Sequence, residues 1–319
     1  VLGGVIGGKT TGAPLSLRIE NRDWANWRER WAAGDLDKLT VPRPGHADYA
    51  GMLKYNLDDA RPVLERASAR ETAARVAVGA VAKLLLAAFD VAVGSHVTEI
   101  GGVIARIPEL TWPELWAQAE ASDVRCPDES AAAHMRQRID AAREDGDSLG
   151  GVFVVAATGL LVGLGSHVQW DRRLDSRLAQ AVMSIQAIKG VEIGPAFENA
   201  RRPGTQVHDE MERESEEAGG HRRVVRTSNR AGGIEGGMTN GEPVAVRAAM
   251  KPIPTTVTPL RSVDLATGEQ AVTQYQRSDV CAVPAASVVG EAMVAWVLAA
   301  ALAEKLGGDS VEEMRSRTS

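Results

Sequence analysis

The stretch that most constrains the fold is residues 285–305, where most side chains are apolar. A helix that is apolar all round fits a buried location. This stretch contains Glu291, and the other long apolar run, residues 78–93, contains Lys83 and Asp90. A membrane span needs about 20 residues with few or no charges. We therefore expect residues 285–305 to form a buried helix and expect no membrane-spanning segment.

The other elements mix strands and helices without the regular strand–helix–strand alternation of a doubly wound sheet, which favours an α+β fold. Periodicity and capping residues predict helices at 58–89, 112–121, 129–144 and 174–188. Alternating patterns predict strands at 15–20, 92–107, 151–157, 160–162, 243–250 and 271–276. Residues 197–237 are polar and rich in glycine, so we expect a long exposed loop there.

Composition excludes several classes of protein. The 36 basic and 42 acidic residues give a net charge of -6, which argues against binding nucleic acid or anionic membranes. The two cysteines, Cys126 and Cys281, are far apart and lack metal-ligand spacing. We therefore expect neither a disulfide framework nor a bound metal, and a reducing, cytoplasmic location.

Residues 3–10 match the phosphate-loop pattern G-x-x-x-x-G-K-[ST]. A phosphate loop follows a buried strand and opens a helix. Only two residues precede Gly3 in this sequence, and Gly12 and Pro14 oppose a helix directly after Lys9. We therefore expect a glycine-rich turn between strands.

Two candidate sites stay ambiguous from the residues alone. His46 lies in a turn beside Asp48, where an imidazole can act as an acid or base or be an ordinary surface residue. Arg66 and Arg70 lie one helical turn apart. They could bind a phosphate together, or belong to a solvated, salt-bridged helix surface.

Three segments near the C-terminal end could contact a ligand. Residues 228–241 contain enough glycine for backbone amides to approach a ligand closely, or they form a flexible loop. Two prolines stiffen residues 251–255, which present one ammonium and one hydroxyl group. Arg277 and Asp279 flank a small turn, where they could also form a plain salt bridge.

Taken together, six stretches resemble the chorismate synthase family, and the similarity covers nearly the entire chain. They are residues 43–48, 65–72, 163–171, 228–241, 251–255 and 277–284. The resemblance implies a lyase that removes phosphate from 5-enolpyruvylshikimate 3-phosphate in an anti-1,4-elimination, giving chorismate at the end of the shikimate pathway. It also implies a need for reduced FMN, with no net redox change. The chemistry agrees, because a departing phosphate needs cations and a breaking carbon–hydrogen bond needs an electron-rich partner.

The resemblance also assigns roles to residues. It implies that His46 acts on the reduced flavin and that Asp279 helps to deprotonate flavin nitrogen 5. It implies that Arg70 faces substrate anions and that residues 197–237 form an active-site flap. The implied FMN contacts are Arg66, Ala67, Ser68, Gln186, Ala187, Gly236, Lys251, Pro252, Ile253, Pro254, Thr255 and Arg277.

The family's architecture is a single-domain β-α-β-α sandwich, in which two antiparallel sheets enclose helices. We expect this fold over residues 1–319, assembled as a homotetramer. An external flavin reductase is the expected source of reduced flavin. The alternative is a bifunctional enzyme that itself reduces FMN with NADPH.

The sequence departs from the family pattern in three places. The family's N-terminal Gly-Glu-Ser-His-Gly segment, with the first catalytic histidine, has no counterpart before Val1. We therefore expect a truncated chain that is impaired in catalysis, or an inactive flavin-binding remnant. Pro254 replaces the usual serine, and Pro195 with Ala196 stands where the family often has Asp-Gly.

Overall fold

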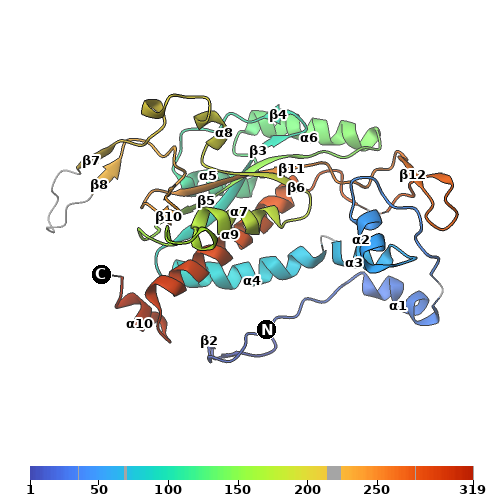
Figure 1. Ribbon diagram of the computed structural model, residues 1–319, viewed down its shortest axis with the longest axis horizontal. Coiled ribbons are helices and arrows are strands. Elements are labelled where there is room, and N and C mark those ends of the chain that lie inside the picture. The colour runs from blue at the N-terminus through green and yellow to red at the C-terminus, as the bar shows by residue number, and fades with distance from the viewer. Residues whose placement is uncertain (35, 68–69, 214–223, 277, 319) are drawn as a thin grey trace. The chain divides into compact units, whose positions relative to one another are not determined.

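The computed structural model describes residues 1–319 except 35, 68–69, 214–223, 277 and 319. The chain divides into two compact units, the elements of which are labelled in Figure 1. The first contains Val1–Ala77 and Pro259–Gln274, and the second contains Val78–Thr258 and Tyr275–Ser319. The predicted site residues are thus shared between the units, with His46 in the first and Asp279 in the second.

The second unit is built on a five-stranded antiparallel sheet (Figure 1). Its strands, in spatial order, are β4 (Val103–Ile104), β3 (Ala92–Ile100), β5 (Gly151–Thr158), β11 (Val244–Met250) and β6 (Ile188–Ile193). Ser95 pairs with Val155, and Val155 pairs with Val246. Directly paired residues point to the same side, so these three side chains share one face of the sheet.

Helix α9 (Val283–Leu306) covers this face, and α7 (Leu174–Met183) lies beside it against β6. Gly290 brings α9 very close to the sheet, because a Cβ there would lie 2.7 Å from the Phe153 ring. Among the described helices, α9 alone is long and apolar enough to span a membrane, yet 72% of that apolar stretch is buried inside the protein. The prediction of a buried helix at 285–305 is confirmed.

Glu291, the one carboxylate in the middle of this apolar helix, is buried in a network of partners. Its Oε1 accepts hydrogen bonds from Ser95 Oγ (2.6 Å) and Arg125 Nη2 (2.8 Å), and its Oε2 pairs with Lys83. Arg125 Nε also donates to Ser287 Oγ at 3.0 Å. A buried charge is tolerated only when it is paired in this way.

Two helices cover the opposite face of β3 and β4. These are α5 (Trp112–Ala121) and α6 (Glu129–Glu144), both with the predicted bounds. Thr111 and Glu114 form a capping box at the start of α5, and the Asp128 carboxylate accepts from Ala131 N–H (3.1 Å) at the start of α6. These caps satisfy amides that have no partner within the helix.

The first unit starts with a hairpin formed by β1 (Val5–Ile6) and β2 (Lys9–Thr10). Gly7 and Gly8 form its turn with φ angles of +58° and +78°, which glycine adopts readily. The next helix of the described chain is α1 (Trp24–Ala33), well after Lys9. The prediction of a glycine-rich turn between strands is therefore confirmed.

Short helices and a second hairpin complete this unit. The helices are α2 (Asp48–Tyr55), α3 (Arg61–Ala67) and the beginning of α4 (Arg70–Ala87), and the hairpin joins β12 (Arg261–Val263) to β13 (Gln270–Val272). Ser262 Oγ donates to the Pro42 carbonyl, and Leu265 N–H donates to the Thr40 carbonyl at 2.9 Å. The hairpin therefore anchors the segment that leads into His46.

Several predicted elements were wrong. Residues 15–20 form no strand beyond a bridge between Gly3 and Ser16, and residues 160–162 form none. The helix expected at 174–188 ends at Met183, and Ile188 begins β6 instead. Pairing with β11 satisfies the backbone of residues 188–193, which overrides their weak helical spacing. Of the helix expected at 58–89, the structure describes α3 and α4; residues 68–69 between them lie outside the described residues, so a continuous helix stays a prediction.

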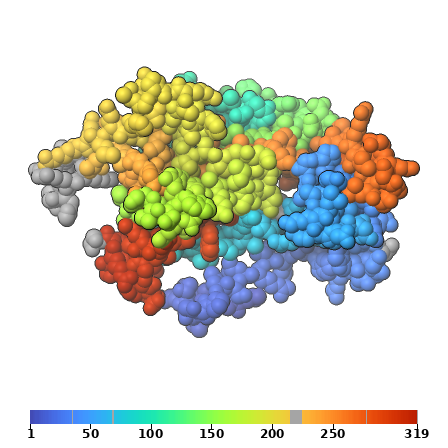
Figure 2. Space-filling view, in the orientation of Figure 1, coloured from blue at the N-terminus to red at the C-terminus, as the bar shows by residue number. Residues whose placement is uncertain are grey.

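The expected long loop at 197–237 contains short elements on the surface of the second unit (Figure 2). They are α8 (Ala196–Asn199), the 3-10 turn η2 (Gly204–Gln206), β7 (Met211–Arg213), β8 (Val224–Arg226) and β9 (Ile234–Glu235), which pairs with β10 (Met238–Thr239). The turn η1 (Trp170–Arg172) and α10 (Val311–Arg315) complete the described elements.

The α+β class is confirmed by this mixture of helices and antiparallel strands. Besides the five-stranded sheet, the described residues form only two-stranded sheets. The second large sheet of the expected sandwich therefore stays a prediction.

Candidate functional site

His46 lies in a turn that closes on a buried carboxylate. Its Nδ1 is 2.6 Å from Asp48 Oδ1. Asp48 begins α2 and also accepts from the Arg43 backbone N–H (3.1 Å), Nε (2.8 Å) and Nη2 (3.1 Å). The side chains of Arg43 and Asp48 are 9% and 2% exposed, whereas that of His46 is 15% exposed. This turn is the most enclosed group of charges in the first unit that contains a predicted site residue.

The environment keeps Asp48 ionised. Burial alone would raise the pKa of this carboxyl group, but hydrogen bonds from His46 and Arg43 outweigh burial and hold the pKa well below its usual range. The imidazole of His46 therefore faces a permanent negative charge. Such a pair of carboxylate and imidazole suits proton transfer.

The predicted arginine site lies on the exposed surface of the first unit. Arg66 and Ala67 are the last residues of α3, and Arg70 is the first residue of α4. Arg70 Nη1 donates to Glu65 at 2.7 Å, and both side chains are about half exposed. The salt-bridged helix surface, one of the two interpretations of the sequence, is what the structure shows at Arg70. Ser68 lies outside the described residues.

The stiff segment 251–255 is held by its backbone in the second unit. Lys251 N–H donates to the Ala187 carbonyl (2.9 Å), and the Ile253 carbonyl accepts from the buried Ser148 hydroxyl (2.7 Å). The Thr255 carbonyl accepts from Ser278 Oγ at 3.1 Å. These bonds bring the predicted flavin contacts at 186–187 and 251–255 together at one end of β11.

Ala187 has an unusual backbone conformation at this place. Its φ is +64°, in the left-handed region where an alanine side chain is unfavourable by roughly 1–2 kcal/mol. It lies with Gln186 in the turn between α7 and β6. Strained residues of this kind persist where the surroundings hold them, and they concentrate at ligand sites.

Asp279 lies near the same end of the sheet. The adjacent Val280 carbonyl accepts from Leu149 N–H at 2.8 Å, and Ser278 contacts Thr255 as described above. The Asp279 side chain is exposed. Arg277 lies outside the described residues.

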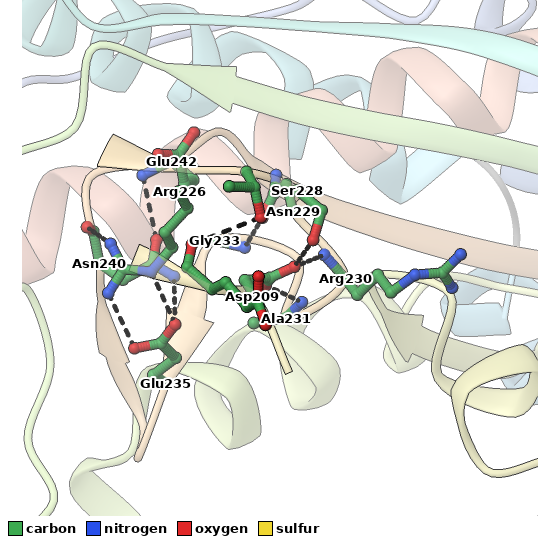
Figure 3. Close-up of polar contacts among 12 residues, drawn as sticks. Asp209, Arg226, Ser228, Asn229, Arg230, Ala231, Gly233, Glu235, Asn240 and Glu242 are labelled. Atoms are coloured by element: carbon green, nitrogen blue, oxygen red, sulfur yellow. Dashed lines mark hydrogen bonds and ion pairs between the residues drawn. The ribbon is translucent and has the colours of Figure 1, made fainter. Parts of the chain in front are cut away.

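The glycine-rich segment 228–241 is held by its own side chains and those of its neighbours, as Figure 3 shows. The Asp209 carboxylate accepts from Ser228 Oγ and from the amides of Arg230 (2.7 Å) and Ala231 (2.8 Å). Arg226 donates to both oxygens of Glu235 at 2.9 Å. The amides of residues 230 and 231 are thus occupied by Asp209, and the approach of other amides of the segment to a ligand stays a prediction.

Gly236 lies apart from Gln186 and Ala187 in the second unit. The neighbouring Gly237 carbonyl accepts from Leu174 N–H (2.8 Å) at the start of α7, whereas Gln186 and Ala187 follow the end of that helix. Ten helical residues extend about 15 Å. Gly236 and Ala187 therefore lie at opposite ends of α7.

A pocket of about 390 Å³ lies in the same unit, between β6, α7, α8 and the glycine-rich segment. Its lining includes Asp175, Glu192, Phe197 and Ala231 and none of the predicted site residues. Among the described residues, no group of three or more His, Cys, Asp or Glu is placed to hold a metal ion.

Sequence reasoning missed the residues that hold these sites in place. The sequence shows that Asp48 is two residues from His46, but this spacing alone assigned no role to Asp48. Asp209 and Ser148 gave no signal, because their partners lie far away in the sequence.

Three comparisons with known proteins point to one family. A protein-family model described as chorismate synthase matches residues 1–303. The chain is 56% identical to the chorismate synthases of Trichlorobacter lovleyi and Desulforamulus reducens, over 99% of its own length and 82% of theirs. A crystal structure of a chorismate synthase superposes with a TM-score of 0.79 and 47% identity, covering 99% of this chain and 81% of the other.

Proposed function

The chain belongs to the chorismate synthase family, and on that premise we propose how its residues divide the work of the family's reaction. That reaction is the elimination of phosphate from 5-enolpyruvylshikimate 3-phosphate to give chorismate, in the shikimate pathway to aromatic amino acids. The observation that carries the function is the 56% identity with chorismate synthases over 99% of the chain.

The family implies a reduced flavin cofactor, and the proposed cofactor is FMN. In the second unit, residues 251–255 with Gln186 and Ala187 would hold it, and Asp279 and Arg277 would lie beside it. Gly236, Arg66, Ala67 and Ser68 are the remaining proposed contacts. The donor set fits, because the Lys251 ammonium and a threonine hydroxyl suit an anionic phosphate tail. When bound in its reduced form, FMN supplies the electron density that breaking the carbon–hydrogen bond requires.

The chain's own side chains would manage protons and anions. His46 holds or releases a proton at its imidazole, and Asp279 accepts one at its carboxylate. Arg70 would exchange its Glu65 partner for a substrate anion. That exchange costs little, because a half-exposed ion pair contributes at most about 1 kcal/mol.

The test of the cofactor site is flavin binding. Photoreduced FMN, titrated anaerobically, should bind the Lys251→Gln variant about 10-fold or more weakly, since a hydrogen bond to a charged group contributes about 1.5–3 kcal/mol. Lys189→Gln is the matched control, because Lys189 is exposed on the neighbouring strand β6. Equal affinity in wild type and Lys251→Gln would refute the proposed site.

The test of the reaction is an anaerobic assay with photoreduced FMN and 5-enolpyruvylshikimate 3-phosphate, which follows chorismate by its absorbance. We propose that an external flavin reductase supplies the reduced flavin. Oxidation of NADPH by the purified protein with FMN would show the bifunctional alternative instead.

We also propose a single-domain sandwich, assembled as a homotetramer in the cytoplasm. Large apolar side chains on the surface of the second unit support the assembly. Leu84 on α4 is 74% exposed, and Trp296 on the mostly buried α9 is 54% exposed. Exposed apolar groups of this size are common at interfaces. Light scattering should show a tetramer in the wild type and smaller species in Leu84→Glu, and a monomeric wild type would refute the assembly.

A further inference from the structure

We infer that Asp48 is a positioning residue, which holds His46 with its proton on Nδ1 and so makes Nε2 the atom that exchanges protons in the reaction. The inference deepens the proposed function and rests on the proposed role of His46. It follows from contacts within one turn of the first unit.

Two contacts compete for His46 Nδ1. Asp48 Oδ1 is 2.6 Å away, and Arg43 Nη2 is 3.0 Å away. The contact with Asp48 requires a proton on Nδ1, whereas a hydrogen bond from Arg43 requires a lone pair there. Both cannot be made at once by a neutral imidazole.

The shorter contact decides the tautomer. Without a proton between them, two lone pairs would face each other at 2.6 Å, which is repulsive. The proton cannot reside on Asp48, because its hydrogen-bond donors keep this carboxyl group ionised. Nδ1 therefore donates to Asp48. Arg43 Nη2 lies 3.0 Å from Nδ1 and 3.4 Å from Nε2, and its longer contact, with the lone pair of Nε2, is compatible with this tautomer.

Asp48 cannot turn away from this position. Oδ2 accepts two hydrogen bonds from Arg43, from its backbone N–H (3.1 Å) and its Nε (2.8 Å). Oδ1 accepts from Arg43 Nη2 (3.1 Å) and from His46. A carboxylate offers about four lone-pair sites, so these donors use its full capacity. The side chain is 2% exposed, so water cannot replace them.

The same donors predict what an amide would do in place of the carboxylate. In Asp48→Asn the side-chain oxygen must face the backbone N–H and Nε of Arg43, since an NH₂ group there would meet two donors. The NH₂ group then faces His46 Nδ1, which must accept. The proton of the neutral imidazole moves to Nε2, which can then no longer accept a proton. The same change of tautomer follows when the orienting aspartate of a hydrolase triad is replaced by asparagine.

The experiment that tests the inference directly is nitrogen NMR of protein labelled with ¹⁵N-histidine. Long-range proton–nitrogen correlations distinguish the two tautomers, and loss of a signal in His46→Gln assigns it. We expect neutral His46 with the proton on Nδ1 in the wild type and on Nε2 in Asp48→Asn. A wild-type imidazole with its proton on Nε2 would overturn the inference, even if the variant did not fold.

Kinetics give the second measurement. Asp48→Asn should lower kcat about 100-fold, within the range for loss of general acid–base catalysis, while its affinity for reduced FMN changes by less than about 3-fold. Asp58→Asn is the matched control, because Asp58 is exposed and pairs only with Lys38 among the ion pairs of the described residues. An unchanged kcat in folded Asp48→Asn would overturn the positioning role. If His46→Gln kept full activity, the proposed function of His46 would fail while the tautomer result stood.

Discussion

The turn that contains His46 and the strand that contains His96 place a histidine in opposite environments. His46 faces the ionised Asp48 at 2.6 Å and is partly exposed. His96, on β3, is 3% exposed, and its Nδ1 has no hydrogen-bond partner. Its ring lies 6.1 Å from that of Trp112. Burial, and then the nearby charge of Arg125, lower the pKa of His96 to about 4.

The difference teaches how to separate a catalytic imidazole from a core one. A ring that contacts an ionised carboxylate and stays partly accessible is placed to exchange protons with a ligand. A ring that is buried beside Trp112, as His96 is, favours the neutral form and serves as packing. Burial alone is therefore a poor marker of function, whereas a charged partner combined with access is a better one.

The largest expected effect tests the comparison by activity. His46→Gln should lower kcat by about 10²–10⁴-fold, because general acid–base catalysis contributes that much. His96→Leu should keep kcat within about 2-fold, since its ring lies in the core. Steady-state assays with photoreduced FMN provide both values. If His96→Leu folded normally but had a much lower kcat, a charged partner would not distinguish a catalytic histidine from a core histidine.

The second prediction contrasts Asp48 with Glu291, another buried carboxylate. Asp48 serves an imidazole, whereas Glu291 compensates the charges of Lys83 and Arg125. Glu291→Gln should therefore lower the free energy of unfolding by about 3 kcal/mol, since it breaks the buried ion pair with Arg125, which keeps only its pair with the exposed Glu120. Urea unfolding measures this change.

Glu304→Gln is the control on the same helix. Glu304 is 43% exposed and pairs with Arg172 and Arg177 at the surface. Its loss should cost less than about 1 kcal/mol. If both variants lost equal stability, burial of the ion pairs would not be the deciding factor.

The third prediction uses the lowered pKa of His96. The folded state favours the neutral His96 ring, so its pKa of about 4 lies below the unfolded value of 6.5. As pH falls from 6.5 toward 4, the ring is protonated in the unfolded chain but not in the folded protein, and the folded state loses stability. Wild type should therefore lose about 3 kcal/mol relative to His96→Leu between pH 6.5 and pH 4. Urea unfolding at several pH values gives the difference, and His167→Leu, at an exposed position, is the control. Parallel stability curves for wild type and His96→Leu would contradict the assignment.

The smallest expected effect concerns the glycine-rich segment. Asp209→Ala removes the acceptor for the amides of Arg230 and Ala231. These amides should exchange with solvent about 10-fold faster, since a lost hydrogen bond costs about 1 kcal/mol or more. Hydrogen exchange measures the rates, and Glu210→Ala, the exposed neighbour, should leave them unchanged.

The sequence predicted best where local chemistry decides the structure. The bounds of α5 and α6 follow from their caps at Thr111 and Asp128, which act on amides only three residues away. The end of α7 was wrong because residues 188–193 pair with β11, more than fifty residues later. The tryptophans and charges of residues 23–41 predict only a loop with a helical turn, whereas α1 forms a longer helix there; none of its side chains is buried, so no apolar face indicated its length.

The candidate site divides in the same way. His46 and residues 251–255 were identified by resemblance, and the structure supplied their partners. Asp48 is two residues from His46, so its contact with His46 could have been predicted from the sequence. The hydrogen bond from Ser148 to Ile253 spans 105 positions, and no local pattern encodes it. Gly236 is the opposite case. The resemblance groups it with Gln186 and Ala187 as a flavin contact, but it lies at the other end of α7 from them.

The buried network around Glu291 also affects how the chain can fold during synthesis. Glu291 meets Ser95 across 196 positions and Lys83 across 208. Lys83 of α4 and the strand β3 therefore leave the ribosome long before Glu291, the carboxylate that pairs with Lys83. Until α9 is made, the apolar face of β3 and β5 has nothing to cover it. Contacts this distant slow folding and prolong exposure to aggregation, so the nascent chain depends on protection until its last long helix arrives.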